Sequence, residues 1–329
     1  MSCWSPAWWR ILWSCRRRAS PMRRLRRPLQ VQPVEPPATA WLARHLPVAS
    51  GALRPGPRRA LRSFAWLVGL LVVLVAILSL QSIVRSVAPD PTLLLGIAFL
   101  TVMLAYGAYA GLVRRFEHRR VEELALRRMP AEIIGGVALG IVLMSLVIGA
   151  LWMCGAYQVT TAQWSDFPHD VREALGTGLL EELLARLVIF RMLACAIRVR
   201  PALILSALLF GGAHLANPHA SFITAAAIAV EAGLMLAGFY LLTGRIWLSA
   251  GVHAGWNFAQ GGIFGAPVSG MPSEGSLLQS LPHAGFPSWV TGGAFGPEGS
   301  LVAVVIGAAA FFATLAVLRR ESRATPDIT

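Results

Sequence analysis

The chain contains few charged residues and no lysine. Of its 329 residues, 14% are charged and 56% are hydrophobic, and the mean hydropathy is +0.61. These values lie outside the usual range of soluble globular proteins. The shortage of charge therefore predicts an integral membrane protein, and the lysine-free, arginine- and alanine-rich composition fits a GC-rich bacterial genome.

Cysteine is scarce, and two metal motifs are missing. The four cysteines, Cys3, Cys15, Cys154 and Cys195, show no CxxC spacing, which argues against a disulfide framework and a thiolate zinc site. No HExxH motif occurs, so the common zincin arrangement is excluded.

Positive charge is concentrated at the N-terminus. Up to Arg62 the chain holds thirteen arginines and one acid, whereas the remainder holds sixteen arginines and fifteen acids. The arginines mix with proline and alanine and lead into an apolar run, which favours contact with lipid over a nucleic-acid partner. We predict a disordered, Arg/Pro-rich cytoplasmic tail over residues 1–60, with no cleaved signal peptide and with translation starting at Met1 or Met22.

Hydropathy predicts an all-α, polytopic membrane helix bundle of about eight transmembrane helices. The spans are expected at residues 64–84, 92–113, 133–157, 174–196, 201–217, 221–242, 246–264 and 300–318. Two N-terminal helices and a basic loop (61–129) precede a core (130–320) and a cytoplasmic tail (321–329). With eight spans, the arginine-rich segments 114–128, 191–200 and 319–323 share one side, which predicts a multi-pass protein of the inner (plasma) membrane with both termini cytoplasmic.

The stretch "GLLEELLARLVIF" (178–190) carries three charges inside an expected span. An ionisable side chain inside the bilayer is costly and indicates a functional site. Glu182 and Arg186 are spaced i, i+4 and can neutralise one another. Glu181 is rotated by about 100° from Glu182, so it is expected to point elsewhere into the bundle.

Two further spans carry polar pairs one helical turn apart. "FGGAH" contains Phe210 and His214, and "HAGWN" contains His253 and Asn257. Three polar clusters on three helices predict one shared site. A carboxylate beside an imidazole can act as a general base on a water, and a second imidazole with a carboxamide can stabilise an oxyanion. The same groups could alternatively hold Zn²⁺.

These motifs resemble those of a known family. "EELLAR", "FGGAH" and "HAGWN" are similar, in order, to the EExxxR, FxxxH and HxxxN motifs of the CAAX protease and bacteriocin-processing (CPBP, or Abi) intramembrane endopeptidases. The resemblance covers roughly residues 130–318. It implies hydrolysis of a membrane protein or peptide, with prenylated substrates in eukaryotes and other membrane proteins or peptides in bacteria.

The resemblance also implies residue roles. Glu181 is expected to act as the general base with His214 positioning the water, and His253 with Asn257 is expected to contact the oxyanion. Glu182, Arg186 and Phe210 would support these groups. If the enzyme is metal-dependent, as the family is often labelled, the candidate ligands are Glu181, His214 and His253; otherwise the mechanism is glutamate-dependent and needs no cofactor.

Other interpretations stay open. Buried Glu, His and Arg also describe a proton-coupled transporter or a bacteriocin-immunity-type protein. Glu231 could line the substrate cavity or hydrogen-bond to a neighbouring helix. "GGAFGP" (292–297) matches an anion-binding element of chloride channels, but a tight turn before the last helix explains it better.

Overall fold

A computed structural model describes residues 37–87, 91–165, 167–273 and 275–324, and these residues are mostly helical. The predicted helical membrane bundle is confirmed. Residues 1–36, with both candidate start sites, lie outside the described part. The helices and strands are η2 (Pro37–Ala43), η3 (Gly51–Leu53), α1 (Arg59–Val87), α2 (Pro91–Leu112), η4 (Val113–Glu117), η5 (Glu122–Leu124), η6 (Leu126–Arg128), α3 (Met129–Met153), β1 (Tyr157–Thr161), α4 (Phe167–Leu175), η7 (Gly176–Glu181), η8 (Leu183–Phe190), α5 (Arg191–Ile197), α6 (Val199–Ala213), η9 (His214–Ala216), α7 (Phe222–Ile228), η10 (Ala229–Leu234), α8 (Met235–Thr243), α9 (Ile246–Phe258), η11 (Ala259–Ile263), β2 (Leu278–Pro282), α10 (Ser288–Thr291), η12 (Gly293–Phe295), η13 (Pro297–Gly299) and α11 (Leu301–Ala324).

Within the described residues, six helices are long and apolar enough to cross a membrane. They cover Arg59–Leu80, Leu93–Glu117, Glu122–Met153, Val199–Ala216, Phe222–Thr243 and Leu301–Ala324. The two other predicted spans fall on the helical runs 167–197 and 246–263, which are not among the six. Eight spans therefore stay a prediction.

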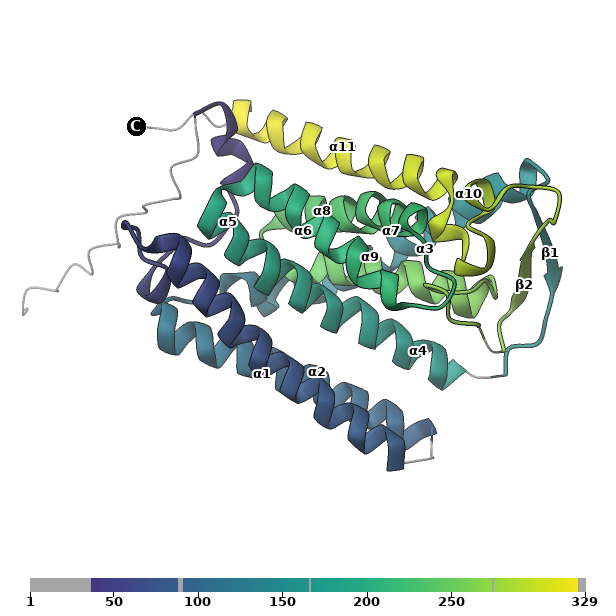
Figure 1. Ribbon diagram of the computed structural model, residues 1–329, viewed down its shortest axis with the longest axis horizontal. Coiled ribbons are helices and arrows are strands. Elements are labelled where there is room, and N and C mark those ends of the chain that lie inside the picture. The colour runs from purple at the N-terminus through teal and green to yellow at the C-terminus, as the bar shows by residue number, and fades with distance from the viewer. Residues whose placement is uncertain (1–36, 88–90, 166, 274, 325–329) are drawn as a thin grey trace, which may run out of the picture. The chain divides into compact units, whose positions relative to one another are not determined.

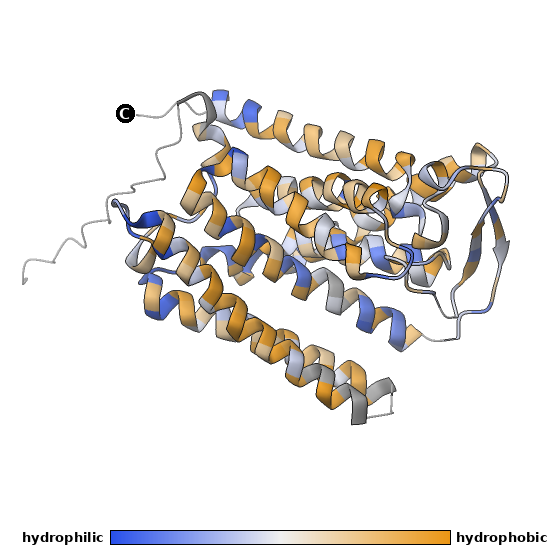
Figure 2. Ribbon diagram, viewed as in Figure 1, coloured by the Kyte–Doolittle hydropathy of each residue, from blue (hydrophilic) through white to orange (hydrophobic). Residues whose placement is uncertain are grey.

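The outer helices present apolar side chains to their surroundings. Figure 1 shows α11 along one side of the bundle and α1 with α2 along another. In Figure 2 these helices are largely coloured as hydrophobic, whereas α4 carries hydrophilic stretches. More than half of the surface of Val72, Phe99, Leu146 and Phe312 is exposed. A wide apolar surface of this kind suits contact with lipid rather than water.

Close contact between α3 and α9 depends on glycine. A Cβ at Gly140 would lie 2.2 Å from the Val252 carbonyl oxygen, and a Cβ at Gly255 would lie 2.2 Å from the Val137 carbonyl oxygen. Glycine at such positions lets two helix backbones approach closely. Because α9 carries the HAGWN motif, this contact fixes the height and rotation of the motif in the bundle.

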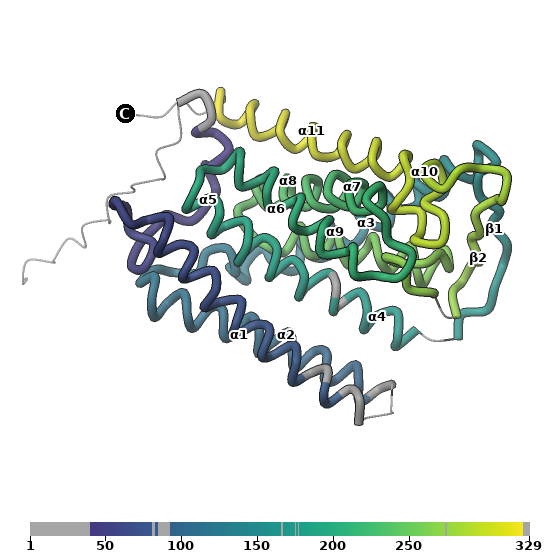
Figure 3. The backbone as a smooth tube through the Cα atoms, in the orientation of Figure 1, coloured from purple at the N-terminus to yellow at the C-terminus, as the bar shows by residue number. Residues whose placement is uncertain are grey.

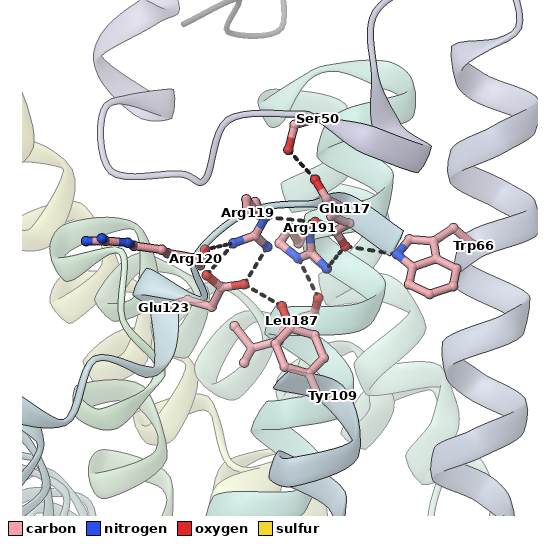
Figure 4. Close-up of polar contacts among 9 residues, drawn as sticks. All are labelled: Ser50, Trp66, Tyr109, Glu117, Arg119, Arg120, Glu123, Leu187 and Arg191. Carbon is pink, nitrogen blue, oxygen red and sulfur yellow. Dashed lines mark hydrogen bonds and ion pairs between the residues drawn. The ribbon is translucent and has the colours of Figure 1, made fainter. Parts of the chain in front are cut away.

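A buried ionic network occupies the end of the bundle where α2 leads into α3 (Figure 4). The Arg191 guanidinium binds the Glu117 carboxylate through two hydrogen bonds of 2.7 and 2.8 Å. Arg119 donates to both Glu117 and Glu123, and the Tyr109 hydroxyl donates to Glu123 at 2.6 Å. The network ties the basic loop to α5, so two of the arginines in the predicted basic segments neutralise internal carboxylates.

Two β-strands occur where the sequence predicts only loops. β1 pairs antiparallel with β2, in the register Tyr157 opposite Pro282 and Thr161 opposite Leu278. The ribbon lies at the end of the bundle opposite the ionic network (Figure 1). The ribbon adds a small β element to the predicted all-α bundle, and hydropathy did not indicate it because the pairing joins segments more than a hundred residues apart.

The predicted disordered tail is too long. Residues 37–53 contain the short 3₁₀ helices η2 and η3, and Leu42, Ala43 and Leu53 are buried. Leu53 packs with Met192 and Cys195 of α5. The boundary at residue 60 is wrong because these few apolar side chains find partners that local composition does not reveal.

Candidate active site

The three polar motifs lie on neighbouring helical segments. Glu181 ends the π-helical segment η7, His214 follows the last residue of α6, and His253 with Asn257 lies on α9. Figure 3 follows the path between them: the tube leaves α6, turns at residues 214–221 and returns through α7 and α8 before α9 begins.

One cavity collects the four predicted catalytic side chains. Glu181, His214, His253 and Asn257 all line a cavity of about 390 Å³. Its outer part is formed by α4 and by the segment that follows η11; the residues there include His169, Asp170, Arg172, Glu173, Val268, Met271 and Pro272. The structure thus brings together the groups that the sequence placed on three separate helices.

The Glu182–Arg186 pair is buried and does not line this cavity. Both side chains are fully inaccessible. Arg186 Nε lies 2.8 Å from Glu182 Oε2, and Arg186 Nη1 donates to the Gly233 carbonyl oxygen at 3.0 Å. Ser249 Oγ also donates to Glu182 Oε2. The charge of Glu182 is therefore fully compensated, as the i, i+4 spacing predicts.

Glu182 also approaches His253. His253 Nδ1 lies 3.4 Å from Glu182 Oε1, and the histidine is 6% exposed. The carboxylate thus faces the buried edge of the His253 ring at an ion-pair distance, while His253 also lines the cavity. Sequence analysis placed Glu182 in a supporting role but did not connect it to His253 or Ser249, because those residues lie on a different helix.

Phe210 lies at the centre of these groups. Its ring centroid is 5.0 Å from that of His214 and 6.1 Å from that of His253, and the Arg186 guanidinium carbon lies 5.1 Å from it. A cation above an aromatic face and edge contacts between rings are both favourable. Phe210 therefore separates the buried ion pair from the cavity and positions both histidines.

His214 has a defined hydrogen-bonding state at one nitrogen. Its Nδ1 lies 2.8 Å from the Phe210 carbonyl oxygen. Because a carbonyl can only accept, Nδ1 carries the hydrogen, and Nε2 of the neutral ring is an acceptor. His214 Nε2, which is not bound to the helix backbone, is therefore available as a hydrogen-bond acceptor.

Glu181 differs from its neighbour Glu182 in its access to space. It is partly exposed and lines both the main cavity and a groove of about 210 Å³ between η8 and α6. The walls of this groove are largely apolar; they include Leu184, Ala185, Ile189, Leu209 and Ala213. Two adjacent carboxylates thus have separate environments, one open and one sealed.

The candidate metal ligands do not form a metal centre. Among the described residues, no three His, Cys, Asp or Glu side chains are arranged to hold a metal ion. Glu181, His214 and His253 line one cavity without meeting that geometry.

Two buried acids lie beside the cavity: Glu231, for which the sequence allowed a place at the cavity, and Glu298, which the sequence did not single out. A space of about 10 Å³, enough for roughly one water, is lined by His214, His253 and Asn257 on one side and by Glu231 and Glu298 on the other. Glu231 is 1% exposed and lines this space, and within the described residues its Oε2 has no hydrogen-bond partner. The only signal for Glu298 was an acid directly after a glycine-rich turn.

Burial raises the pKa of the Glu298 carboxyl above its usual value, while the hydrogen bond from Ser269 and the nearby His214 oppose that shift. The GGAFGP segment before Glu298 forms a tight turn, with φ of +81° at Gly292 and +122° at Gly296. A Cβ at Gly292 would lie 1.7 Å from the Gly296 carbonyl oxygen, so the turn requires glycine there. The turn thus places Glu298, which lies just before α11, beside the cavity.

Comparison with known proteins agrees with the motifs. Residues 163–259 match the family model described as type II CAAX prenyl endopeptidase Rce1-like. The matched segment contains all three motifs, and the family model is one of the CPBP family that the motifs resemble. No curated protein and no solved structure matches the chain.

Proposed function

We propose that the protein is an intramembrane endopeptidase that hydrolyses peptide bonds of a membrane-associated protein or peptide, since residues 163–259 match the Rce1-like type II CAAX prenyl endopeptidase family. The observation that carries this proposal is the common cavity of Glu181, His214, His253 and Asn257. A hydrolase needs its groups around one point, whereas a proton relay arranges them along a path. This geometry favours a protease over a transporter or an immunity-type protein.

Glu181 is the proposed general base. Its carboxylate takes a proton from a water in the cavity, and His214 Nε2 accepts the second hydrogen of that water and orients it. The water oxygen then attacks the carbonyl carbon of the substrate. Glu181 is suited to this role because Glu182, unlike Glu181, is already neutralised by Arg186.

His253 and Asn257 are the proposed oxyanion contacts. When the carbonyl carbon becomes tetrahedral, its oxygen gains negative charge. The His253 imidazolium, with Nδ1–H facing Glu182, donates from Nε2–H to this oxygen, and the Asn257 carboxamide donates beside it. Glu182 and Ser249 hold His253 and its surroundings in place. Glu181 then returns its proton to the leaving amine as the carbon–nitrogen bond breaks, which restores the carboxylate.

The substrate class follows from the surroundings of the site. The apolar groove between η8 and α6 meets the main cavity at Glu181 and His214. An apolar part of a substrate could occupy the groove while the peptide bond lies in the polar cavity. The family description names prenylated CAAX proteins, whereas the lysine-free composition favours a bacterial membrane protein or peptide without a prenyl group.

A proteome comparison tests the function in cells. Newly formed protein N-termini in membranes are quantified in cells with the wild-type protein, with Glu181→Gln and with Glu122→Gln, an exposed carboxylate in the loop after α2. We expect at least one cleavage product to vanish, and its precursor to accumulate, in the Glu181→Gln cells alone. Identical N-termini in all three strains, at equal protein levels, would refute the endopeptidase function.

A further inference from the structure

The segment 267–272, here called the roof segment, forms one wall of the catalytic cavity. Val268, Ser269, Met271 and Pro272 line the cavity together with Glu181 and Asn257. Val268 and Met271 exchange two backbone hydrogen bonds of 2.9 Å, so the segment folds back on itself as a tight turn. A substrate in the cavity would therefore lie between this turn and the catalytic side chains.

The roof segment has an uncommon backbone conformation. Ser269 has φ of +50° and Gly270 has φ of +83°. A residue with a Cβ rarely adopts positive φ unless its surroundings hold it there. A Cβ at Gly270 would lie 1.9 Å from the Pro218 carbonyl oxygen, so the turn is also pressed against the loop that follows His214.

Glu298 supplies the polar contact that holds this conformation. Its Oε1 accepts hydrogen bonds from both the backbone N–H and the hydroxyl of Ser269, the latter at 2.8 Å. The Gly270 N–H donates to the Phe295 carbonyl oxygen at 2.7 Å, which adds a second link to the same glycine-rich turn. Glu298 is 2% exposed, so loss of its carboxyl would leave the two part-buried Ser269 donors without their acceptor, which is costly.

We propose that Glu298 is a positioning residue: it anchors the roof segment over the catalytic cavity and so sets where the substrate lies opposite Glu181 and Asn257. The catalytic part of this inference rests on the proposed endopeptidase function, whereas the anchoring part does not. Through Ser269, Glu298 holds a wall of the substrate cavity, so loss of this contact weakens substrate binding more than the chemical step.

Hydrogen exchange of the purified full-length protein tests the anchoring. In Glu298→Ala, amide exchange in peptides that cover the roof segment should become roughly tenfold faster or more, since both hydrogen bonds from Ser269 are lost. Ser269→Gly, which removes the hydroxyl but tolerates positive φ, should give a smaller increase. Glu231→Gln is the matched control, because Glu231 borders the same small space without contacting Ser269.

If amide exchange in the roof segment is unchanged in both Glu298→Ala and Ser269→Gly, then Glu298 does not anchor this segment. Ser269→Gly also serves if Glu298→Ala does not fold. For catalysis, cleavage of a membrane peptide substrate in Ser269→Gly and Glu298→Ala should show a raised KM with kcat within a few-fold of wild type. Faster exchange with an unchanged KM overturns the positioning role, and a wild-type protein that cleaves nothing contradicts the endopeptidase function instead.

Discussion

Adjacent carboxylates in the EELLAR motif face different surroundings. Glu182 is sealed by Arg186 and Ser249, whereas Glu181 lines two open spaces. The rotation of about 100° between neighbouring helical residues separates them. We therefore propose a different role for each carboxylate: Glu182 stabilises the helix packing, and Glu181 acts on the substrate.

Removing Arg186 tests the architectural role. Arg186→Ala would leave the Glu182 carboxylate buried without its main partner and would also remove the guanidinium from the Phe210 face. We expect the free energy of unfolding in detergent to fall by about 3–5 kcal/mol, a range typical of a broken buried pair. Denaturant titration of the purified variant measures it.

Arg172→Ala is the control for this prediction. Arg172 also pairs with a glutamate, Glu173, but that carboxylate is 46% exposed. Pairs of this kind contribute at most about 1 kcal/mol. If both variants lose the same free energy of unfolding, the buried Glu182–Arg186 pair stabilises the protein no more than the more exposed Arg172–Glu173 pair.

At the residue scale, contacts within one helix were predictable and contacts between helices were not. The Glu182–Arg186 pair follows from i, i+4 spacing alone. The approach of His253 to Glu182 and the bonds of Ser269 to Glu298 join residues 29 or more positions apart. Such contacts depend on helix packing, for which a single sequence carries no local pattern.

Among the elements, the contact between α3 and α9 determines the position of the second histidine. An added methyl group at Gly140 would collide with the Val252 carbonyl oxygen, one residue before His253. Gly140→Ala should therefore lower the free energy of unfolding by about 1–3 kcal/mol, as overpacking does. It should also reduce proteolysis, because α9, which carries His253 and Asn257, must move away from α3. Denaturant titration and cleavage assays measure the two effects.

Gly149→Ala provides the matched control on the same helix. No atom lies within 4 Å of a Cβ at Gly149. Alanine is the better helix former, so stability should stay the same or rise slightly, by up to about 1 kcal/mol. A Gly140→Ala protein as stable and active as Gly149→Ala would contradict the role given to this contact.

Hydropathy predicted where most helices lie because membrane helices need long apolar runs. Hydropathy located the helices less accurately in segments that carry charge, such as the run 167–197. It did not predict the pairing of β1 with β2. The order of residues 37–53 was also missed, because a few apolar side chains among prolines do not show a periodic pattern. The elements that the sequence did not predict are short, and they depend on contacts with distant parts of the chain.

For the whole molecule, the ionic network reduces the number of arginines that support the predicted membrane orientation. Arg119 and Arg191 neutralise buried carboxylates, so they do not act as free loop charges. Exposed arginines remain at the same end of the bundle, among them Arg114, Arg115 and Arg120. We still propose that this end faces the cytoplasm and that the cavity opens towards the other side.

Cysteine labelling in intact cells tests the orientation. Cys154 is exposed at the end of α3 next to the ribbon, and Ala213 lines the groove beside Glu181. With the other cysteines replaced, Cys154 and Ala213→Cys should react with a membrane-impermeant thiol reagent from outside, and Arg120→Cys only after lysis. The reverse pattern would invert the proposed topology and leave the chemistry unchanged.

The central claim is that Glu181 activates water without a metal ion. The decisive measurement is the cleavage rate of a membrane peptide substrate by the purified protein in liposomes, for wild type and Glu181→Gln, with a divalent-metal chelator present. We predict that the wild-type rate is unaffected by the chelator and that Glu181→Gln is slower by roughly 10²–10⁴-fold, the usual contribution of a general base. A wild-type rate abolished by the chelator and restored by zinc, or a Glu181→Gln protein as fast as wild type, would contradict it.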